Sequence, residues 1–168
     1  MAAVADRIGV TKPVLYACFA SRHELIDAML EREERLLLAG VLGALGSRAN
    51  TDDPEPLLVA GFQALLEAVE QRAGSWRLVF APEPDPAVAE RFGRAHRLVA
   101  ERVAAVMEPV LTASGTRDVQ RKLPVLVELF MAAGDGAVRA LIGQADEWTT
   151  ADLGEFVGRT VFRAFNGA

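Results

Sequence analysis

Apolar residues recur every three or four positions along most of this chain, and no stretch alternates between apolar and polar residues as a strand does. Glycine, proline and short polar clusters divide the pattern into segments. The segments predicted to be helical are residues 2–8, 11–19, 21–45, 55–71, 75–80, 86–112, 117–142 and 150–165. The pattern therefore predicts an all-α fold.

The residues at the segment ends support this division. Gly9 suits the left-handed residue that ends a helix, Thr11 suits an N-cap, and Pro13 fits the first turn of the helix that follows. Two other helix starts have the spacing of a capping box, at Ser21–Glu24 and Thr149–Asp152. The first 19 residues therefore form a compact unit of a short helix, a glycine turn and a second short helix.

Composition restricts the class of protein. Hydrophobic residues make up 51% of the 168 residues, which argues against a disordered chain. Charged residues interrupt every apolar run before it reaches membrane-spanning length, and the first residues have no basic segment like that of a secretory signal. The single cysteine excludes an internal disulfide. We expect a cytoplasmic protein that does not contact a membrane.

The charge is distributed unevenly. The formal net charge is −5, but Arg7, Lys12 and Arg22 outnumber the single acid, Asp6, in the first 22 residues. Acidic residues gather later in the chain. A locally basic end on an acidic body fits contact with phosphate at that end.

Residues 2–19 read as a helix-turn-helix, a unit that can present its second helix to the major groove of DNA. We expect five apolar residues to form its small core, Val4, Ile8, Val10, Leu15 and Phe19. Four polar residues are left outside as donors to phosphate, Thr11, Lys12, Tyr16 and Arg22. The alternative is a helical corner that binds nothing.

The run Ile8-Gly9-Val10-Thr11-Lys12-Pro13-Val14-Leu15-Tyr16, with Phe19, Ser21 and Leu25, resembles the signature of the tetracycline-repressor (TetR) family. The resemblance implies that residues 11–19 are the recognition helix. Thr11, Lys12, Tyr16 and Arg22 would then contact phosphate, and Pro13 and Val14 would meet base edges or a thymine methyl group. Residues 1–45 would be the DNA-binding module with its connecting helix, and residues 46–168 the ligand-binding and dimerisation domain.

The sequence departs from that family at its start. The family places one more helix before the helix that begins here at Ala2. Either the natural start lies upstream or the DNA-binding module lacks its first helix. We therefore expect the chain as given to bind DNA weakly or not at all.

A second set of residues points to a small-molecule pocket. Aromatic and other large side chains lie on central helices that should face one another, and a pocket of this kind is apolar with a few polar groups. The residues expected to line it are Phe62, Trp76, Phe80, Phe92, His96, Met107 and Phe130. The alternatives are an ordinary core and, for His96, a histidine at the core edge without a special role.

The last two helices carry more apolar and small residues than one core needs. We expect them to form a symmetric four-helix seam between two copies of the chain. The residues expected there are Phe130, Ala133, Gly136, Ala137, Leu153, Phe156, Val157 and Val161. The alternative is a monomeric core with a frayed C-terminal helix.

The chain has no metal-ligand spacing of Cys and His and no nucleophile motif, so we expect no catalytic residue, no metal and no cofactor. The sequence favours a homodimeric transcription regulator that binds a palindromic operator and represses until a small apolar effector releases it. One alternative is a relative that dimerises and binds a small molecule but not DNA. A helical enzyme and a structural partner protein are two more.

Overall fold

The computed structural model describes residues 1–46, 54–143 and 147–166, with side chains described up to residue 36 in the first segment and 165 in the last. These residues form eight helices and no strand, so the prediction of an all-α fold is confirmed. In chain order the helices are α1 (Ala2–Ile8), α2 (Lys12–Cys18), α3 (Arg22–Gly46), α4 (Pro54–Glu70), α5 (Ala73–Val79), α6 (Pro86–Ala113), α7 (Val119–Gly143) and α8 (Thr150–Asn166).

Three predicted helix ends are confirmed. Gly9 ends α1 in the left-handed conformation, with φ of 71°. The backbone N–H of Glu24 donates to Ser21 Oγ at 3.1 Å at the start of α3. The N–H of Asp152 donates to Thr149 Oγ1 at 3.1 Å at the start of α8. Thr11 precedes α2 as predicted, although its side chain caps no N–H.

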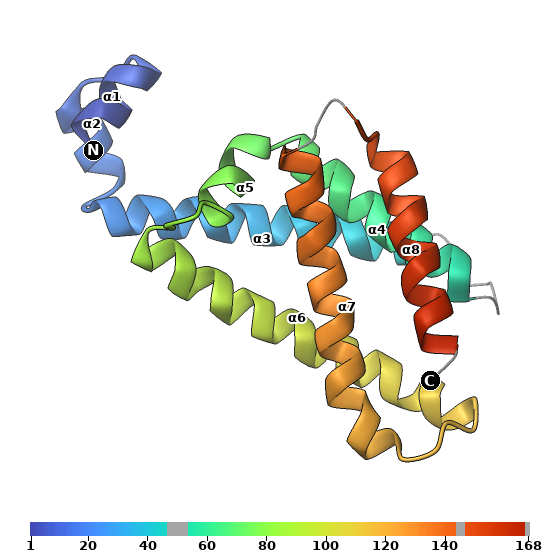
Figure 1. The fold of residues 1–168 in the computed structure, drawn as a ribbon. Helices are drawn as coiled ribbons and strands as arrows, with labels where there is room; N and C mark the ends of the chain where they lie inside the picture. The colour runs from blue at the N-terminus through green and yellow to red at the C-terminus, as the bar shows by residue number, and fades with distance from the viewer. Residues whose placement is uncertain (47–53, 144–146, 167–168) are drawn as a thin grey trace.

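The first two helices stand apart from the rest of the molecule (Figure 1). α1 and α2 contact each other, and among the described residues they contact no other helix. They are joined to the body through α3, which extends from this small unit across the other helices (Figure 1). The long helix therefore carries the helix-turn-helix unit at its N-terminal end.

The main core lies where α4, α5, α7 and α8 meet. Leu66 and Val69 of α4 are fully buried there, with Trp76 of α5 beside them. α7 and α8 complete this cluster with Ala137, Val138, Leu141 and Leu153. Burial of these side chains supplies the main hydrophobic stabilisation of the body.

Two glycines bring α8 onto α4. A Cβ atom at Gly158 would lie 2.6 Å from Val59 Cα, and one at Gly154 would lie 2.8 Å from Gln63 Cα. Both distances are shorter than any side chain allows, so the two backbones approach this closely only because these positions are glycine. The contact buries Leu153 and Val161 on the same helix.

We predict that Gly158→Ala lowers the free energy of unfolding by about 1–3 kcal/mol, because the methyl group overlaps the α4 backbone. The measurement is chemical denaturation. The matched control is Gly74→Ala in α5, where no atom lies within 4 Å of an added Cβ. Equal effects of the two substitutions would contradict the close contact between α4 and α8.

Candidate DNA-binding surface and ligand pocket

The helix-turn-helix unit has a smaller core than the sequence predicted. Ala5 and Leu15 are buried between α1 and α2. Val4 and Ile8 are 37% and 58% exposed, so their predicted place in this core is wrong. The physical reason is that α1 contacts only α2 among the described residues, so the apolar side of α1 that faces away from α2 has no cover.

The five residues of this unit expected to contact DNA, Thr11, Lys12, Pro13, Val14 and Tyr16, are exposed. Thr11, Lys12 and Pro13 lie at the start of α2, with Thr11 at its N-cap position. Val14, which follows Pro13 directly, and Tyr16 are 52% and 51% exposed. The helix therefore presents hydroxyl, ammonium and phenol groups together with an apolar side chain, which is the chemistry needed for phosphate and base contacts.

Arg22, the sixth residue expected to contact DNA, is exposed and also contacts the body. Its guanidinium forms an ion pair with Asp85, the N-cap residue of α6. The other carboxylate oxygen of Asp85 accepts from the N–H of Ala87 at 3.0 Å. The Arg22 side chain, and next the Ala87 N–H, hold the pKa of Asp85 below its usual value of 3.8. The sequence analysis missed Asp85, although an aspartate directly before Pro86 is typical of a helix start.

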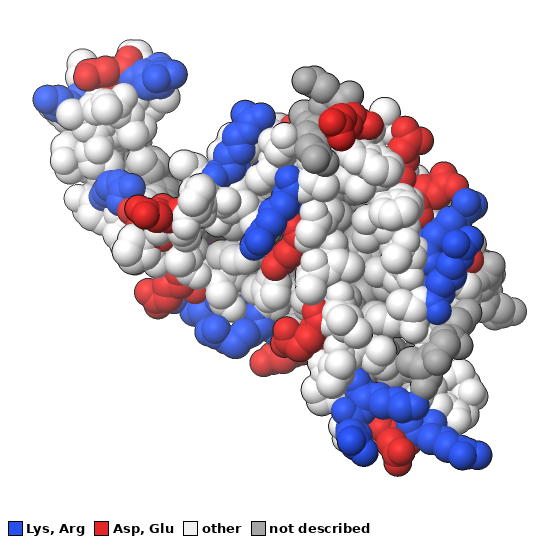
Figure 2. Space-filling model, in the orientation of Figure 1, with Lys and Arg blue, Asp and Glu red and all other residues white. Residues whose placement is uncertain are grey.

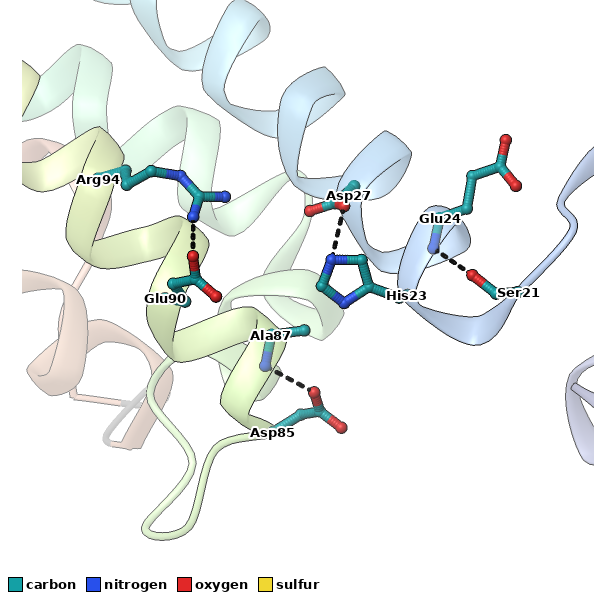
Figure 3. A network of polar contacts seen from close by, with 8 residues as sticks. All are labelled: Ser21, His23, Glu24, Asp27, Asp85, Ala87, Glu90 and Arg94. Carbon is teal, nitrogen blue, oxygen red and sulfur yellow. Dashed lines mark hydrogen bonds and ion pairs between the residues drawn. The ribbon is translucent and has the colours of Figure 1, made fainter.

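Other polar contacts lie at the same junction (Figure 3). On α3, His23 Nε2 lies 3.1 Å from Asp27 Oδ2, and this pair faces the first turns of α6 (Figure 3). Glu90 and Arg94 form an ion pair along α6. These side chains lie near the N-terminal ends of α3 and α6, the two helices that the ion pair between Arg22 and Asp85 connects.

Further along α3, two ion pairs attach it to the body. Glu33 Oε2 lies 3.3 Å from Arg72 Nε, beside the start of α5, and Glu34 Oε2 lies 3.5 Å from Arg91 of α6. The side chains of Glu33 and Arg72 are 12% and 24% exposed, so solvent screens this pair only in part. The structure therefore fixes the helix that carries the helix-turn-helix unit against α5 and α6.

Four of the seven residues expected to bind a ligand form a continuous row between α5 and α6. Ring centroids are 6.2 Å apart for Trp76 and Phe80, 5.5 Å for Phe80 and Phe92, and 5.4 Å for Phe92 and His96. Phe62 and Phe130 form a separate pair at 5.4 Å between α4 and α7. Met107 is half-buried on α6 and belongs to neither group.

An open pocket of about 420 Å³ lies beside this row, at the connection between α5 and α6. Phe80 and Phe92 line it, whereas Trp76 and His96 do not. The other lining residues are Val79, Ala81, Pro82, Pro84, Ala89 and Arg139. The sequence analysis missed Arg139, whose guanidinium carbon lies 5.1 Å from the centre of the Phe80 ring. The sequence signal that could have identified this residue is a single arginine within an otherwise apolar stretch of α7.

His96 contacts a carboxylate rather than the pocket. Its Nε2 lies 3.4 Å from Asp135 Oδ2, so the two side chains link α6 to α7. The Nε2 atom is buried, and the geometry of this contact is too poor for a hydrogen bond. The side chain as a whole is 29% exposed, which places His96 at the edge of the core.

The residues expected at a dimer seam divide into two groups. Ala137, Leu153 and Val161 are buried in the chain's own interior. Phe156 is 57% exposed, Gly136 is exposed, and the remaining residues, Phe130, Ala133 and Val157, are half-buried. The view in Figure 2 shows a broad uncharged surface over α7 and α8. The exposed apolar residues Val125 and Leu129 of α7, which the sequence analysis did not select, add to the apolar surface of that helix.

Within the described segments, no group of three or more His, Cys, Asp and Glu side chains is arranged to hold a metal ion. No helix in those segments combines the length and the apolar character needed to cross a membrane.

Part of the chain is similar to a curated protein, the HTH-type transcriptional activator FasR of Mycolicibacterium smegmatis (strain ATCC 700084 / mc(2)155). The two sequences are 42% identical over 77 residues, which is 46% of this chain and 34% of the FasR chain. The aligned segment thus spans about a third of that relative's length. No family model matches the chain. The similarity relates this chain to helix-turn-helix transcription regulators.

We predict that Arg22→Gln raises the pKa of Asp85 toward 3.8, because the largest cause of its lowering is removed. A pKa lowered in the folded state means that the contact stabilises the folded chain at neutral pH and is lost as the pH falls through the lowered value. Titration of the carboxyl carbon by NMR measures the shift. Arg94→Gln, which removes the partner of Glu90, is the matched control and should leave Asp85 unchanged. A pKa of Asp85 that is the same with and without Arg22 would contradict the ion pair.

Proposed function

We propose that this chain is a TetR-type transcription regulator that works in the cytoplasm, binds operator DNA through α2 and responds to a small apolar effector bound in its helical body. The observation that carries the proposal is the exposed face of α2 on a two-helix unit that contacts no other helix among the described residues. The similarity to an HTH-type transcription regulator supports it. The absence of catalytic motifs in the sequence agrees with a regulator rather than an enzyme.

In this proposal α2 lies in the major groove. Thr11, Lys12 and Tyr16 donate to phosphates, and Pro13 and Val14 contact base edges or a thymine methyl group. Arg22 pairs with Asp85 through Nη1, and its guanidinium has further N–H donors that can contact a phosphate. The carboxylate of Asp85 would offset part of the positive charge that Arg22 presents to DNA.

A palindromic operator requires two copies of α2 about 34–36 Å apart, which is one turn of DNA. We propose that α7 and α8 of two copies pack around a two-fold axis to give this spacing. Exposed Phe156 and Gly136 would lie at the centre of the seam, with Phe130, Ala133 and Val157 covered further by the partner. The buried residues Ala137, Leu153 and Val161 would support this surface from within.

The proposed direction of control is repression that the effector releases. FasR is named as an activator, so its name does not support this direction. A reporter gene placed under control of the operator distinguishes repression from activation. Expression that falls when the protein is added indicates a repressor, and expression that rises indicates an activator.

We predict that Lys12→Ala weakens binding to every DNA sequence and lowers the slope of log affinity against log salt by about one unit, because one phosphate contact is lost. Fluorescence anisotropy over a range of salt concentrations measures both quantities. Arg121→Ala removes an exposed cation from the first turn of α7, a helix whose start lies far from α1 and α2 (Figure 1). This variant is the control and should change neither quantity.

Two results of this experiment would overturn parts of the proposal. An unchanged salt slope for Lys12→Ala would remove Lys12 from the interface. No binding of any DNA, either by this chain or by a form that carries one more helix before Ala2, would favour the alternative function, a relative that dimerises and binds a small molecule without contacting DNA.

We predict that Phe156→Arg converts a dimer into a monomer, because an unpaired charge within the seam costs several kcal/mol. The unmodified chain should sediment as a dimer at roughly micromolar concentration, since the seam should bury more than about 1,000 Å². Val106→Arg is the control, because Val106 is 68% exposed on α6, outside the proposed seam, and this variant should remain a dimer. A monomer of the unmodified chain would exclude the seam.

A further inference from the structure

We propose that the pocket between α5, α6 and α7 binds an apolar small molecule that carries a carboxylate, with the carboxylate held by Arg139. This inference deepens the effector part of the proposed function and rests on it only for the consequence on DNA binding. Binding of the molecule itself depends on the pocket alone.

The residues that line the pocket are of apolar types except for a single cation. Phe80, Phe92, Pro82 and Pro84 are among the residues that line it, and its volume of about 420 Å³ is within the usual range for small-molecule sites. Arg139 is the one charged residue among the lining residues in the described part of the chain. The fixed φ angles of the two prolines limit movement of that part of the wall.

Arg139 has no carboxylate partner within the described residues. Asp135 lies one turn earlier on α7, at the spacing at which aspartate and arginine commonly pair on a helix. That carboxylate lies instead 3.4 Å from His96 Nε2 of α6. Within the described residues, therefore, no carboxylate neutralises the positive charge beside the pocket.

The position of the guanidinium suits an anion. Its central carbon lies over the Phe80 ring, 5.1 Å from the ring centre, at the distance of a cation–π contact. The N–H donors of arginine lie in the plane of the guanidinium and match the two oxygens of a carboxylate. Phe80 thus holds Arg139 at the pocket, and the apolar part of the ligand would pack on Phe80 and Phe92.

A set of matched ligands tests the head group. The probes are 4-cyclohexylbutanoate, the corresponding alcohol, the corresponding amine and 4-cyclohexylbutyl phosphate, which share one apolar part and absorb no near-ultraviolet light. Isothermal titration calorimetry gives the dissociation constants for the full chain. The carboxylate should bind roughly tenfold more tightly than the alcohol, as expected for a charge-assisted hydrogen bond that is partly exposed to solvent, and the amine most weakly.

Tryptophan fluorescence is a second measurement, and it tests whether the ligand occupies this pocket. Trp76 stacks on Phe80 with ring centres 6.2 Å apart, so occupation of the pocket should change its fluorescence. Trp148→Phe leaves Trp76 as the one tryptophan in the chain. A carboxylate that binds without any change in Trp76 fluorescence, and with equal affinity for Arg139→Gln, binds elsewhere and overturns the proposal.

Variants of Arg139 test whether this residue binds the carboxylate. Arg139→Gln should remove the preference for carboxylate over alcohol, and Arg139→Lys, which keeps the charge, should restore part of it. Arg77→Gln is the matched control, because Arg77 is an exposed arginine of α5 that does not line the pocket. Equal affinities for the carboxylate and the alcohol would overturn the proposal, as would a preference that survives Arg139→Gln. Tighter binding of the phosphate than of the carboxylate would overturn the choice of head group.

These outcomes are separate from those of the proposed function, since no DNA is present in the titrations. If the carboxylate binds as expected but leaves operator affinity unchanged, the site stands and the effector role fails. If operator binding is intact but the carboxylate does not bind, this inference fails and the DNA-binding proposal stands.

Discussion

The close contact between α4 and α8 determines how the body of this protein is arranged. Gly154 and Gly158 let the α8 backbone approach Val59 and Gln63 to distances that no side chain would allow. That approach buries one face of α8 and leaves Phe156 on the opposite, exposed face. The surface available for a second copy of the chain is thus a consequence of the packing of α8 against its own neighbour.

The helix-turn-helix unit depends on the body through one helix. Ion pairs from Glu33 and Glu34 hold α3 against α5 and α6, whereas in the described part of the chain α1 and α2 make no such contacts with the body. Arg22, at the first position of α3, forms the ion pair with the body that lies nearest in sequence to the helix-turn-helix unit. Its partner Asp85 caps α6, so the position of α6 and the charge presented near α2 are directly connected.

The short connection between α5 and α6 contributes both to the pocket and to the ion pair of Arg22. Pro82 and Pro84 line the pocket, and Asp85 follows directly and holds Arg22. The pocket wall and the partner of Arg22 are therefore adjacent in the chain, at Pro84 and Asp85.

The sequence by itself determined the all-α fold, the approximate helix bounds and the exposed polar face of α2, because helical periodicity and capping residues act over a few neighbouring positions. It did not determine that Val4 and Ile8 lie exposed, that α8 lies against α4, or that Arg139 stands beside Phe80. Periodicity shows which residues are apolar but not which helix covers them. Only tertiary packing, which joins residues distant in the chain, decided those contacts and with them the pocket.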